Sequence, residues 1–284
     1  MKIKPLMLGD CLALMKALPN NCVDLVMTSP PYVDARNYGI GFTIKGQAWV
    51  DWAVERYLEC VRICRGAVVW VVEGKTRNYQ WDATPALLMA DLHRAGAKLR
   101  KPPAFQRVGI PGSGGPDWFR NDYEFCIASS KGKLVGCDNT AMGKPPKYGP
   151  GGAPSHRTKT GARINAKRTP SQKERSNGRD GNGSYKPPKL ANPGNIIHCK
   201  VGGGAMGSPL AHDNEAPFPE RLAEFFIRSC CPPGGIVLDP FVGSGTVPAV
   251  AIRAGRRWMG MECRESQIEL TRRRIKEVQQ EFAV

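Results

Sequence analysis

The sequence predicts an α/β protein built on a doubly wound, mostly parallel sheet that carries a basic insertion. Short apolar runs that end at Pro or Gly alternate with segments of helical spacing on both sides of a basic stretch. Such alternation implies a parallel sheet covered by helices on both faces. The glycine loop near the carboxyl end belongs to a strand–loop–helix unit, and too few strands follow the start of this unit to complete the sheet. The other strands must therefore come from the amino-terminal half.

The amino-terminal half supplies the first alternating elements. AVVWVV at 67–72 is a continuous apolar run typical of a buried strand, whereas apolar residues from 50 to 61 recur at helical spacing. A Pro-Pro pair stops a strand, and Thr84 favours an N-cap. The predicted elements are a helix over 10–18, a strand over 23–27, a helix ahead of Gly66, a strand over 67–72, a helix over 85–95 and a strand over 123–129.

The carboxy-terminal half is organised by two glycine-containing turns. The sequence PPGG at 232–235 ends a helix and leads into a strand, and a second glycine loop connects that strand to the next helix. The predicted elements are a helix over 219–231, strands over 236–239 and 257–262, and helices over 246–254 and 266–282.

Positive charge is concentrated in one segment. The chain has a formal net charge of +16, and residues 131–200 hold 15 Lys or Arg against 3 Asp or Glu, which contributes +12. The segment is rich in Gly and Pro and has few periodic apolar residues, so it cannot build its own core. Clustered positive charge favours nucleic acid. Two interpretations stay open, a disordered basic linker and a DNA-contacting segment with Arg157, Arg163, Lys167, Arg168, Arg175 and Arg179 as candidates.

Composition excludes several classes of protein. A content of 41% apolar and 23% charged residues excludes wholesale disorder. No apolar run approaches the ~18 residues of a membrane span, and the amino terminus lacks the apolar region of a signal peptide, so we expect a soluble, cytoplasmic protein. The 10 Cys and 4 His show no metal-ligand spacing. We therefore expect reduced, mostly buried cysteines and no metal site.

The stretch IVLDPFVGSGT at 236–246 combines a strand, a glycine turn and a helix start, which is where α/β sheets bind nucleotides. Gly243 and Gly245 allow the backbone to approach a ligand closely. Glu262 follows Gly243 by 19 residues, where an acid can accept both ribose hydroxyls. The third glycine of the dinucleotide pattern is missing, which disfavours a pyrophosphate. A nucleoside without phosphate, such as S-adenosylmethionine, fits better.

The tetrapeptide Ser29-Pro30-Pro31-Tyr32 at the end of a predicted strand is the most specific feature of the chain. An aryl amine is a poor nucleophile because its lone pair is delocalised into the ring. The Ser29 hydroxyl and the Pro30 carbonyl can accept hydrogen bonds from both N–H groups and so localise that lone pair toward a methyl donor. The prolines fix the backbone, and Tyr32 offers a ring on which an extruded base can stack.

These motifs resemble those of the DNA amino-methyltransferases, which use S-adenosylmethionine to methylate the exocyclic amine of cytosine (N4) or adenine (N6). TSPPY at 28–32 resembles their catalytic motif, LGDC at 8–11 the segment that faces the adenine of the cofactor, and NEAPFPER at 214–221 the segment around its methionine end. The order of motifs is similar to the circularly permuted beta class. The resemblance implies a Rossmann-like methyltransferase fold and a cofactor site formed by Asp10, Cys11, Phe218, Asp239, Pro240, Phe241, Gly243, Ser244, Gly245, Thr246 and Glu262.

The resemblance also implies a division of roles along the chain. Residues 1–130 are expected to form the catalytic half of the methyltransferase domain, 131–200 a DNA-recognition insertion, and 201–284 the cofactor-binding half of the same domain. A Ser at the position of Ser29 is similar to the N4-cytosine enzymes, whereas adenine enzymes more often carry Asp or Asn. We therefore expect site-specific N4-cytosine methylation of double-stranded DNA, as in restriction-modification, with N6-adenine as the alternative. A partner restriction endonuclease and a homodimer stay open.

Other classes of function stay open from the residues alone. A nicotinamide-dependent oxidoreductase would use the glycine loop but leaves the Ser-Pro-Pro-Tyr segment unexplained. A non-catalytic DNA-binding protein would explain the basic segment but leaves the glycine loop without a role. Cytosine C5 methylation is disfavoured because it needs a Cys nucleophile, and the Cys231-Pro232 pair lies far from the catalytic strand in the sequence.

Overall fold

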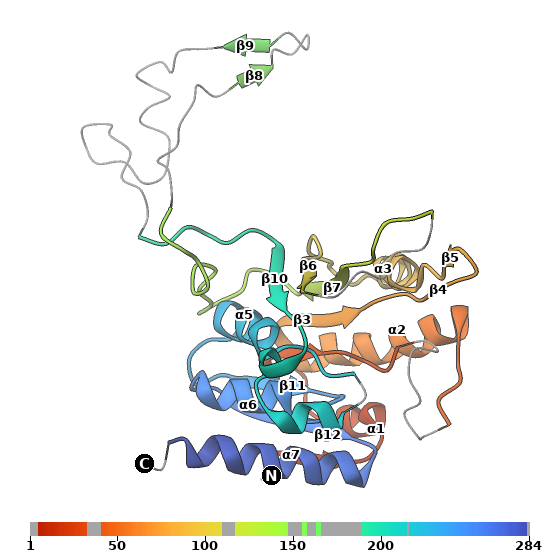
Figure 1. The fold of residues 1–284 in the computed structure, drawn as a ribbon, viewed down its shortest axis with the longest axis vertical. Helices are drawn as coiled ribbons and strands as arrows, with labels where there is room; N and C mark the ends of the chain where they lie inside the picture. Colours follow the sequence, from red (N-terminus) through yellow and green to blue (C-terminus); the bar gives the residue numbers. More distant parts are fainter. Residues whose placement is uncertain are drawn as a thin grey trace. The chain divides into compact units, whose positions relative to one another are not determined.

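The computed structural model describes residues 5–32, 41–109, 117–146, 155–157, 163–165, 189–214 and 216–282. The chain divides into two compact units. The first comprises Met1–Asp138 and Gly194–Val284, and the second is Asn139–Pro193. The first unit contains the main sheet and every helix that the structure describes (Figure 1).

The first unit is built on an eight-stranded sheet. Its strands, in spatial order, are β1 (Leu6–Leu8), β12 (Arg257–Glu262), β11 (Ile236–Asp239), β2 (Val23–Thr28), β3 (Cys64–Val72), β7 (Tyr123–Ser130), β6 (Ala104–Val108) and β10 (Ile196–Lys200). All neighbours pair in parallel except β7, which is antiparallel to both β3 and β6. The predicted mostly parallel sheet is therefore confirmed.

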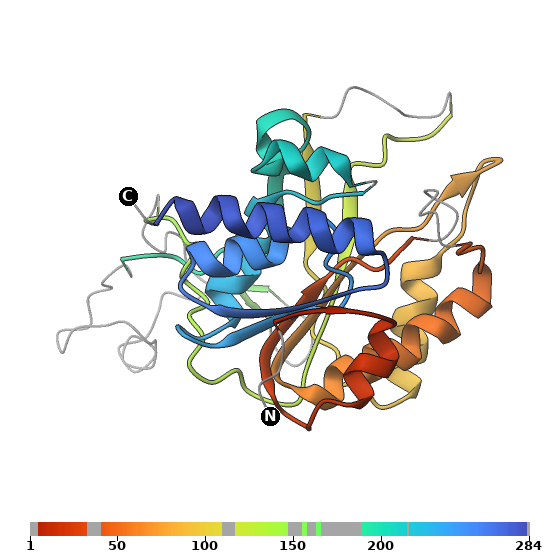
Figure 2. The same ribbon diagram turned by 90° about the horizontal axis from the view of Figure 1, so that it is seen from below.

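Helices cover both faces of this sheet (Figure 2). One layer consists of α1 (Cys11–Lys16), α2 (Gly46–Ile63) and α3 (Thr84–Arg94), and the other of α5 (Glu220–Cys230), α6 (Thr246–Arg253) and α7 (Glu265–Gln280). Each face has its own apolar cluster, with Met15, Trp49 and Leu88 on the first and Leu222 and Val247 on the second. None of the helices in the described ranges is long and apolar enough to cross a membrane.

The two halves of the sequence meet at the centre of the sheet, where β11 pairs with β2 through Val237↔Leu25 and Leu238↔Val26. From β11 the chain continues through α6 to β12 on one side, and from β2 it continues through α2 to β3 on the other. The carboxyl ends of β2 and β11 therefore form a topological switch point, where α/β sheets bind their ligands. The expectation that amino-terminal strands complete the sheet is confirmed.

Two local predictions are corrected by the structure. β3 begins at Cys64 and includes Gly66, where a Cβ atom would lie 2.0 Å from the Asp24 carbonyl oxygen. Glycine is therefore needed there for the close approach of β3 to β2. Thr84 is the first residue of α3 and not its N-cap, a position that Ala83 occupies. The Asp82 carboxylate accepts the hydrogen bond from the Thr84 backbone N–H instead, at 3.0 Å.

Some short strands were not predicted from the sequence. β4 (Thr76–Arg77) and β5 (Gln80–Trp81) form a separate hairpin after β3, while β6 and β10 extend the main sheet. β10 lies within residues 131–200, yet it pairs with β6 in the first unit. Its side chains alternate between exposed and buried, as in an edge strand with one covered face.

The second unit contains the antiparallel pair β8 (Ser155–Arg157) and β9 (Arg163–Asn165). Arg157 lies opposite Arg163 in this pair. The remaining candidates for DNA contact, Lys167, Arg168, Arg175 and Arg179, lie outside the described residues.

Candidate active site

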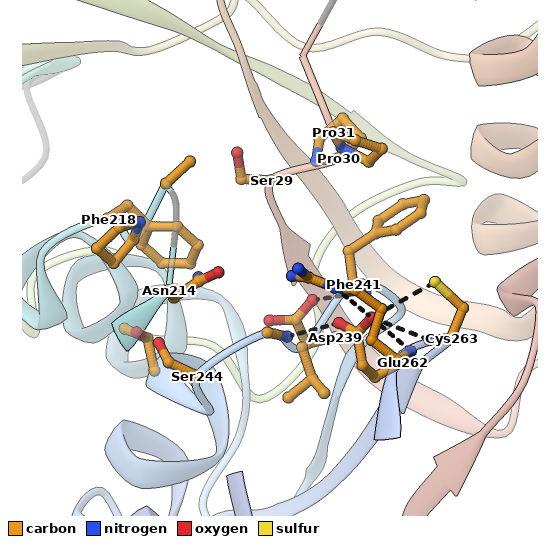
Figure 3. Close-up of a pocket in the computed structure, with 16 residues that line it drawn as sticks. Ser29, Pro30, Pro31, Asn214, Phe218, Asp239, Phe241, Ser244, Glu262 and Cys263 are labelled. Carbon is orange, nitrogen blue, oxygen red and sulfur yellow. Dashed lines mark hydrogen bonds and ion pairs between the residues drawn. The ribbon is translucent and has the colours of Figure 1, made fainter. Parts of the chain in front are cut away.

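A cavity lies at the switch point, at the carboxyl ends of β2 and β11 (Figure 3). This first cavity holds about 680 Å³ of atom-free space, part of it open to solvent. Its walls come from parts of the chain that are distant in sequence. The lining residues include Ser29, Pro30, Pro31, Asn214, Phe218, Asp239, Phe241, Gly243, Ser244, Thr246 and Glu262.

The glycine loop between β11 and α6 forms the floor of the first cavity. Gly243 and Gly245 have φ angles of +48° and +80°, in the left-handed region that favours glycine. A Cβ atom on Gly243 would lie 2.9 Å from the Asn214 side-chain amide. The Thr271 hydroxyl donates a 2.6 Å hydrogen bond to the Gly243 carbonyl and so fixes the loop from behind. The backbone here is held in a conformation that leaves room for a ligand.

Glu262 ends β12 and presents its carboxylate beside this loop. Oε2 accepts a hydrogen bond from the Gly243 N–H at 3.2 Å, and Oε1 accepts from the N–H groups of Cys263 and Arg264 at 3.0 and 3.1 Å. The side chain is buried. Three backbone donors therefore fix the orientation of an acceptor group that lines the cavity.

Asp239 connects the glycine loop to the strand that carries the Ser-Pro-Pro-Tyr segment. Its Oδ1 accepts hydrogen bonds from the Thr28 hydroxyl at 2.5 Å and from the Phe241 N–H at 3.0 Å. Burial raises the pKa of this carboxyl to about 7, against the lowering effect of the two hydrogen bonds. Residues 211 positions apart in the sequence are thus locked together at the centre of the site.

The segment after β2 follows the wall of the first cavity and then leaves it. Ser29, Pro30 and Pro31 line this cavity. The Ser29 hydroxyl lies 3.2 Å from the Val71 carbonyl, to which it donates. The Pro31 carbonyl accepts a 2.9 Å hydrogen bond from the Trp49 indole, which holds the proline pair against α2.

Tyr32 lines a second, larger cavity of about 1,510 Å³ that is also open to solvent. Its phenolic hydroxyl donates to the Glu124 carboxylate at 2.8 Å, and Glu124 lies 3.5 Å from Arg107. Phe218 lines both cavities. The four residues of the Ser-Pro-Pro-Tyr segment therefore connect two adjoining spaces.

The second cavity contains carboxyl groups in unusual environments. Burial raises the pKa of Glu73 to about 7, although Oε1 accepts a 3.0 Å hydrogen bond from the Trp81 indole. The other oxygen of Glu73 is buried and has no partner among the described residues. Burial also raises the pKa of Glu124. Groups with such shifted pKa values gather at functional sites.

The remaining cofactor candidates lie away from the lining of the first cavity. Asp10 caps α1 by accepting from the Ala13 N–H at 3.1 Å, and it forms a 3.2 Å ion pair with Arg56. Cys11 is buried, which raises its pKa to about 12. Pro240 and Gly245 are not among the lining residues, although they belong to the loop. A cofactor contact by Asp10 or Cys11 stays a prediction.

Several residues of the two cavities were not predicted. Cys263 and Arg264 line the first cavity, as does Asn214, which begins the segment 214–221 that the resemblance assigned to the cofactor but was not itself named as a candidate. Glu73 and Arg107 line the second. Glu73 directly follows the apolar run AVVWVV, so a carboxyl group at the end of a predicted strand was the indication available in the sequence. No cluster of metal ligands occurs in the described part of the chain.

Comparisons with known proteins agree with this geometry. The family described as DNA methylase, the N6/N4 methyltransferases, matches residues 23–273. The chain is 27% identical over 276 residues to the DNA adenine methyltransferase YhdJ of Escherichia coli (strain K12), covering 96% of this chain and 82% of the relative. It is also 27% identical to the Type II methyltransferase M.ScaI of Streptomyces caespitosus, covering 92% and 78%. The fold is similar to that of the PvuII DNA methyltransferase (cytosine-N4-specific), with a TM-score of 0.66, 18% identity and coverage of 97% and 89%.

Proposed function

The chain belongs to the DNA methylase family of N6- and N4-specific amino-methyltransferases, and on this premise we propose that it methylates the exocyclic N4 amine of cytosine in double-stranded DNA. The methyl donor of the family is S-adenosylmethionine. One observation supports the proposal most directly, namely that Ser29 to Pro31 line one cavity while Tyr32 lines the adjoining one. The segment thus lies between a space for the donor and a space for the base.

The residues of the first cavity fit S-adenosylmethionine. The Glu262 carboxylate, held by three backbone N–H groups, still has lone pairs for the ribose hydroxyls. The glycine loop lets the ligand approach the backbone, and Phe241 and Phe218 provide aromatic walls. Bound there, the cofactor supplies an electrophilic sulfonium methyl group.

The Ser-Pro-Pro-Tyr segment orients the acceptor amine. The Pro31 carbonyl is engaged by Trp49, so the Ser29 hydroxyl and the Pro30 carbonyl are left as acceptors for the two N–H groups of the base. These two hydrogen bonds localise the lone pair of the amine nitrogen and direct it at the methyl group. Tyr32, anchored through Glu124, holds the ring of the extruded base in the second cavity. The protein therefore acts through positioning and electrostatics.

Identification of the methylated nucleoside tests the target base. DNA from cells that express the protein is digested and its nucleosides are separated by mass spectrometry, with a Ser29→Ala strain as control. We expect N4-methylcytosine in the parent strain and its loss in the control. Detection of N6-methyladenine instead would show that the target base is adenine. Detection of 5-methylcytosine would overturn the chemistry assigned to Ser29.

The proposal extends to the recognition of the target sequence and to the cellular partners of the protein. We propose that residues 139–193, with 12 Lys or Arg against 2 Asp or Glu, recognise the target sequence.

Several relatives are Type II methyltransferases. We therefore propose a restriction endonuclease of the same specificity as the companion enzyme. The proposed location is the cytoplasm, where the DNA substrate lies. Cleavage of unmethylated DNA by an extract of the source cells tests the companion, and sedimentation tests a homodimer.

A further inference from the structure

The β4–β5 hairpin carries an exposed aromatic side chain at its tip. Tyr79 lies in the two-residue turn between β4 and β5, and 81% of its surface is accessible. Both views show the hairpin extending outward from the end of β3 (Figure 1 and Figure 2). Exposure of a large aromatic side chain to water is unfavourable, and binding of a partner removes this exposed surface. Exposed aromatic side chains are therefore concentrated at interaction sites.

The backbone at this tip is one that tyrosine disfavours. Asn78 and Tyr79 have φ angles of +47° and +63°. Two successive left-handed residues form the tight hairpin turn for which Asn-Gly is the preferred sequence. A bulky residue in the second position stores strain, and such strain is found where function requires the side chain.

The root of the hairpin is fixed to the body of the protein. The Trp81 indole donates to Glu73, and its ring stacks on Phe125 with centroids 6.2 Å apart. The Asp82 N–H donates to the Lys75 carbonyl at 3.0 Å. A Cβ atom on Gly74 would lie 2.4 Å from the Trp81 indole nitrogen, so the root is closely packed. The tip is therefore held in a defined place relative to the second cavity.

That cavity is the space assigned above to the extruded base, and the hairpin root forms part of its wall. Glu73, Gly74, Lys75 and Thr76 line it together with Tyr32. The five residue steps from Gly74 to Tyr79 span at most about 17 Å, at about 3.3 Å per step. The grooves of DNA are about 8 Å deep. A hairpin rooted at the cavity can thus reach the base stack, and its Lys75 and Arg77 match the phosphates in charge.

We propose that the β4–β5 hairpin enters the DNA duplex at the target site and that the Tyr79 ring takes the place of the extruded base in the stack. Extrusion costs the stacking of the target base, and an inserted aromatic ring restores part of it to the neighbouring bases. The inference rests on the family's action on duplex DNA. It does not depend on whether cytosine or adenine is the target.

The variant Tyr79→Gly separates stability from insertion. Glycine relieves the strained turn, so the thermal unfolding midpoint should stay the same or rise. On matched duplex, we expect kcat/KM for methylation to fall about 10-fold, because one stacked ring is lost. On a duplex whose target base is mismatched, and therefore already easier to extrude, the loss should be less than about 2-fold. A duplex with 2-aminopurine at the target position should show a weaker rise in fluorescence on binding of the variant.

Two control variants complete the experiment. Tyr79→Phe keeps the ring and should retain methylation within about 2-fold of the parent. Phe282→Ala removes another exposed aromatic residue, which follows α7 near the carboxyl end and lines neither cavity; it should change nothing. Equal losses for Tyr79→Gly on matched and mismatched DNA, or unchanged methylation of matched DNA, would overturn the inference. A parent enzyme that methylates adenine would overturn the cytosine proposal alone.

Discussion

Glu262 is a buried side chain whose orientation is fixed by the backbone around it. Three backbone N–H groups hold its carboxylate beside the glycine loop. The spacing of 19 residues from Gly243 indicated this residue in the sequence. The donors that orient it could not be predicted, because they combine the Gly243 N–H of the glycine loop with the N–H groups of Cys263 and Arg264 in the turn after β12.

Replacement of Glu262 tests its role in cofactor binding. Glu262→Ala removes an acceptor for two hydroxyls, and we expect S-adenosylmethionine affinity to fall by about 2 to 3 kcal/mol, as for other hydrogen bonds to charged groups. Isothermal titration calorimetry measures the change. Glu269→Ala, an exposed residue of α7, is the matched control and should bind like the parent. An unchanged affinity in Glu262→Ala would refute the ribose assignment.

Ser29 and Tyr32 should affect different steps, since they line different cavities. Ser29→Ala removes an acceptor for the amine, so turnover should fall while cofactor affinity stays close to that of the parent. Tyr32→Ala removes a stacking platform and should weaken capture of the extruded base by about 1 to 3 kcal/mol. Single-turnover methylation and calorimetry separate the two effects.

The same chemistry makes a further prediction about covalent trapping. In the proposed mechanism the amine attacks the methyl group directly, so DNA that carries 5-fluorocytosine should form no stable adduct with the protein. Denaturing gel electrophoresis of the mixture provides the measurement, and a shifted band would contradict the direct mechanism.

Among the elements, α7 supports the glycine loop through a buried arginine. The Arg274 side chain is fully buried and pairs with Glu220 of α5 at 2.7 Å. It also donates to the Thr246 hydroxyl at 3.0 Å, at the start of α6. Arg253 of α6 forms a second 2.7 Å pair with Glu220. Three helices are therefore tied together directly behind the loop that lines the first cavity.

Removal of the buried arginine should destabilise the protein. For Arg274→Met we expect a loss of about 3 kcal/mol in the free energy of unfolding, at the low end for a broken buried pair, because Arg253 still neutralises Glu220. Arg272→Met removes an exposed arginine two residues away, whose ion pair lies on the surface, and should change stability by less than about 0.5 kcal/mol. Urea denaturation compares the two, and equal effects would contradict the supporting role of Arg274.

Strands with continuous apolar sequence were predictable, and strands with mixed exposure near one edge of the sheet were not. β3 and β11 were recognised because their side chains are buried on both faces, which requires continuous apolar sequence. β6 and β10 lie toward one edge of the sheet and alternate or mix exposed and covered side chains, so their sequences carry a weaker pattern. The β4–β5 hairpin is shorter than any sequence periodicity can identify.

For the whole molecule, we expect the uneven charge to make a separable contribution to DNA affinity. Deletion of residues 140–190 should flatten the dependence of DNA binding on salt, because each lost phosphate contact lowers the log–log slope by about 0.9. The core clusters belong to the first unit, so S-adenosylmethionine binding should survive. Fluorescence anisotropy over a range of salt concentrations gives the slope. If the deletion variant showed the same salt dependence as the parent, the basic segment would not contact the DNA phosphates.

The sequence by itself determined the fold class, the glycine loop and the Ser-Pro-Pro-Tyr segment. These features depend on local properties, namely apolar periodicity, glycine conformation and proline stiffness. Tertiary structure alone decided how they combine. The pairing of β11 with β2 brings Asp239 to Thr28, and the packing after β2 sends Ser29 and Tyr32 into different cavities. The strain at Tyr79 likewise emerges only in three dimensions. Contacts between residues distant in sequence depend on strand order and register, which no local pattern specifies.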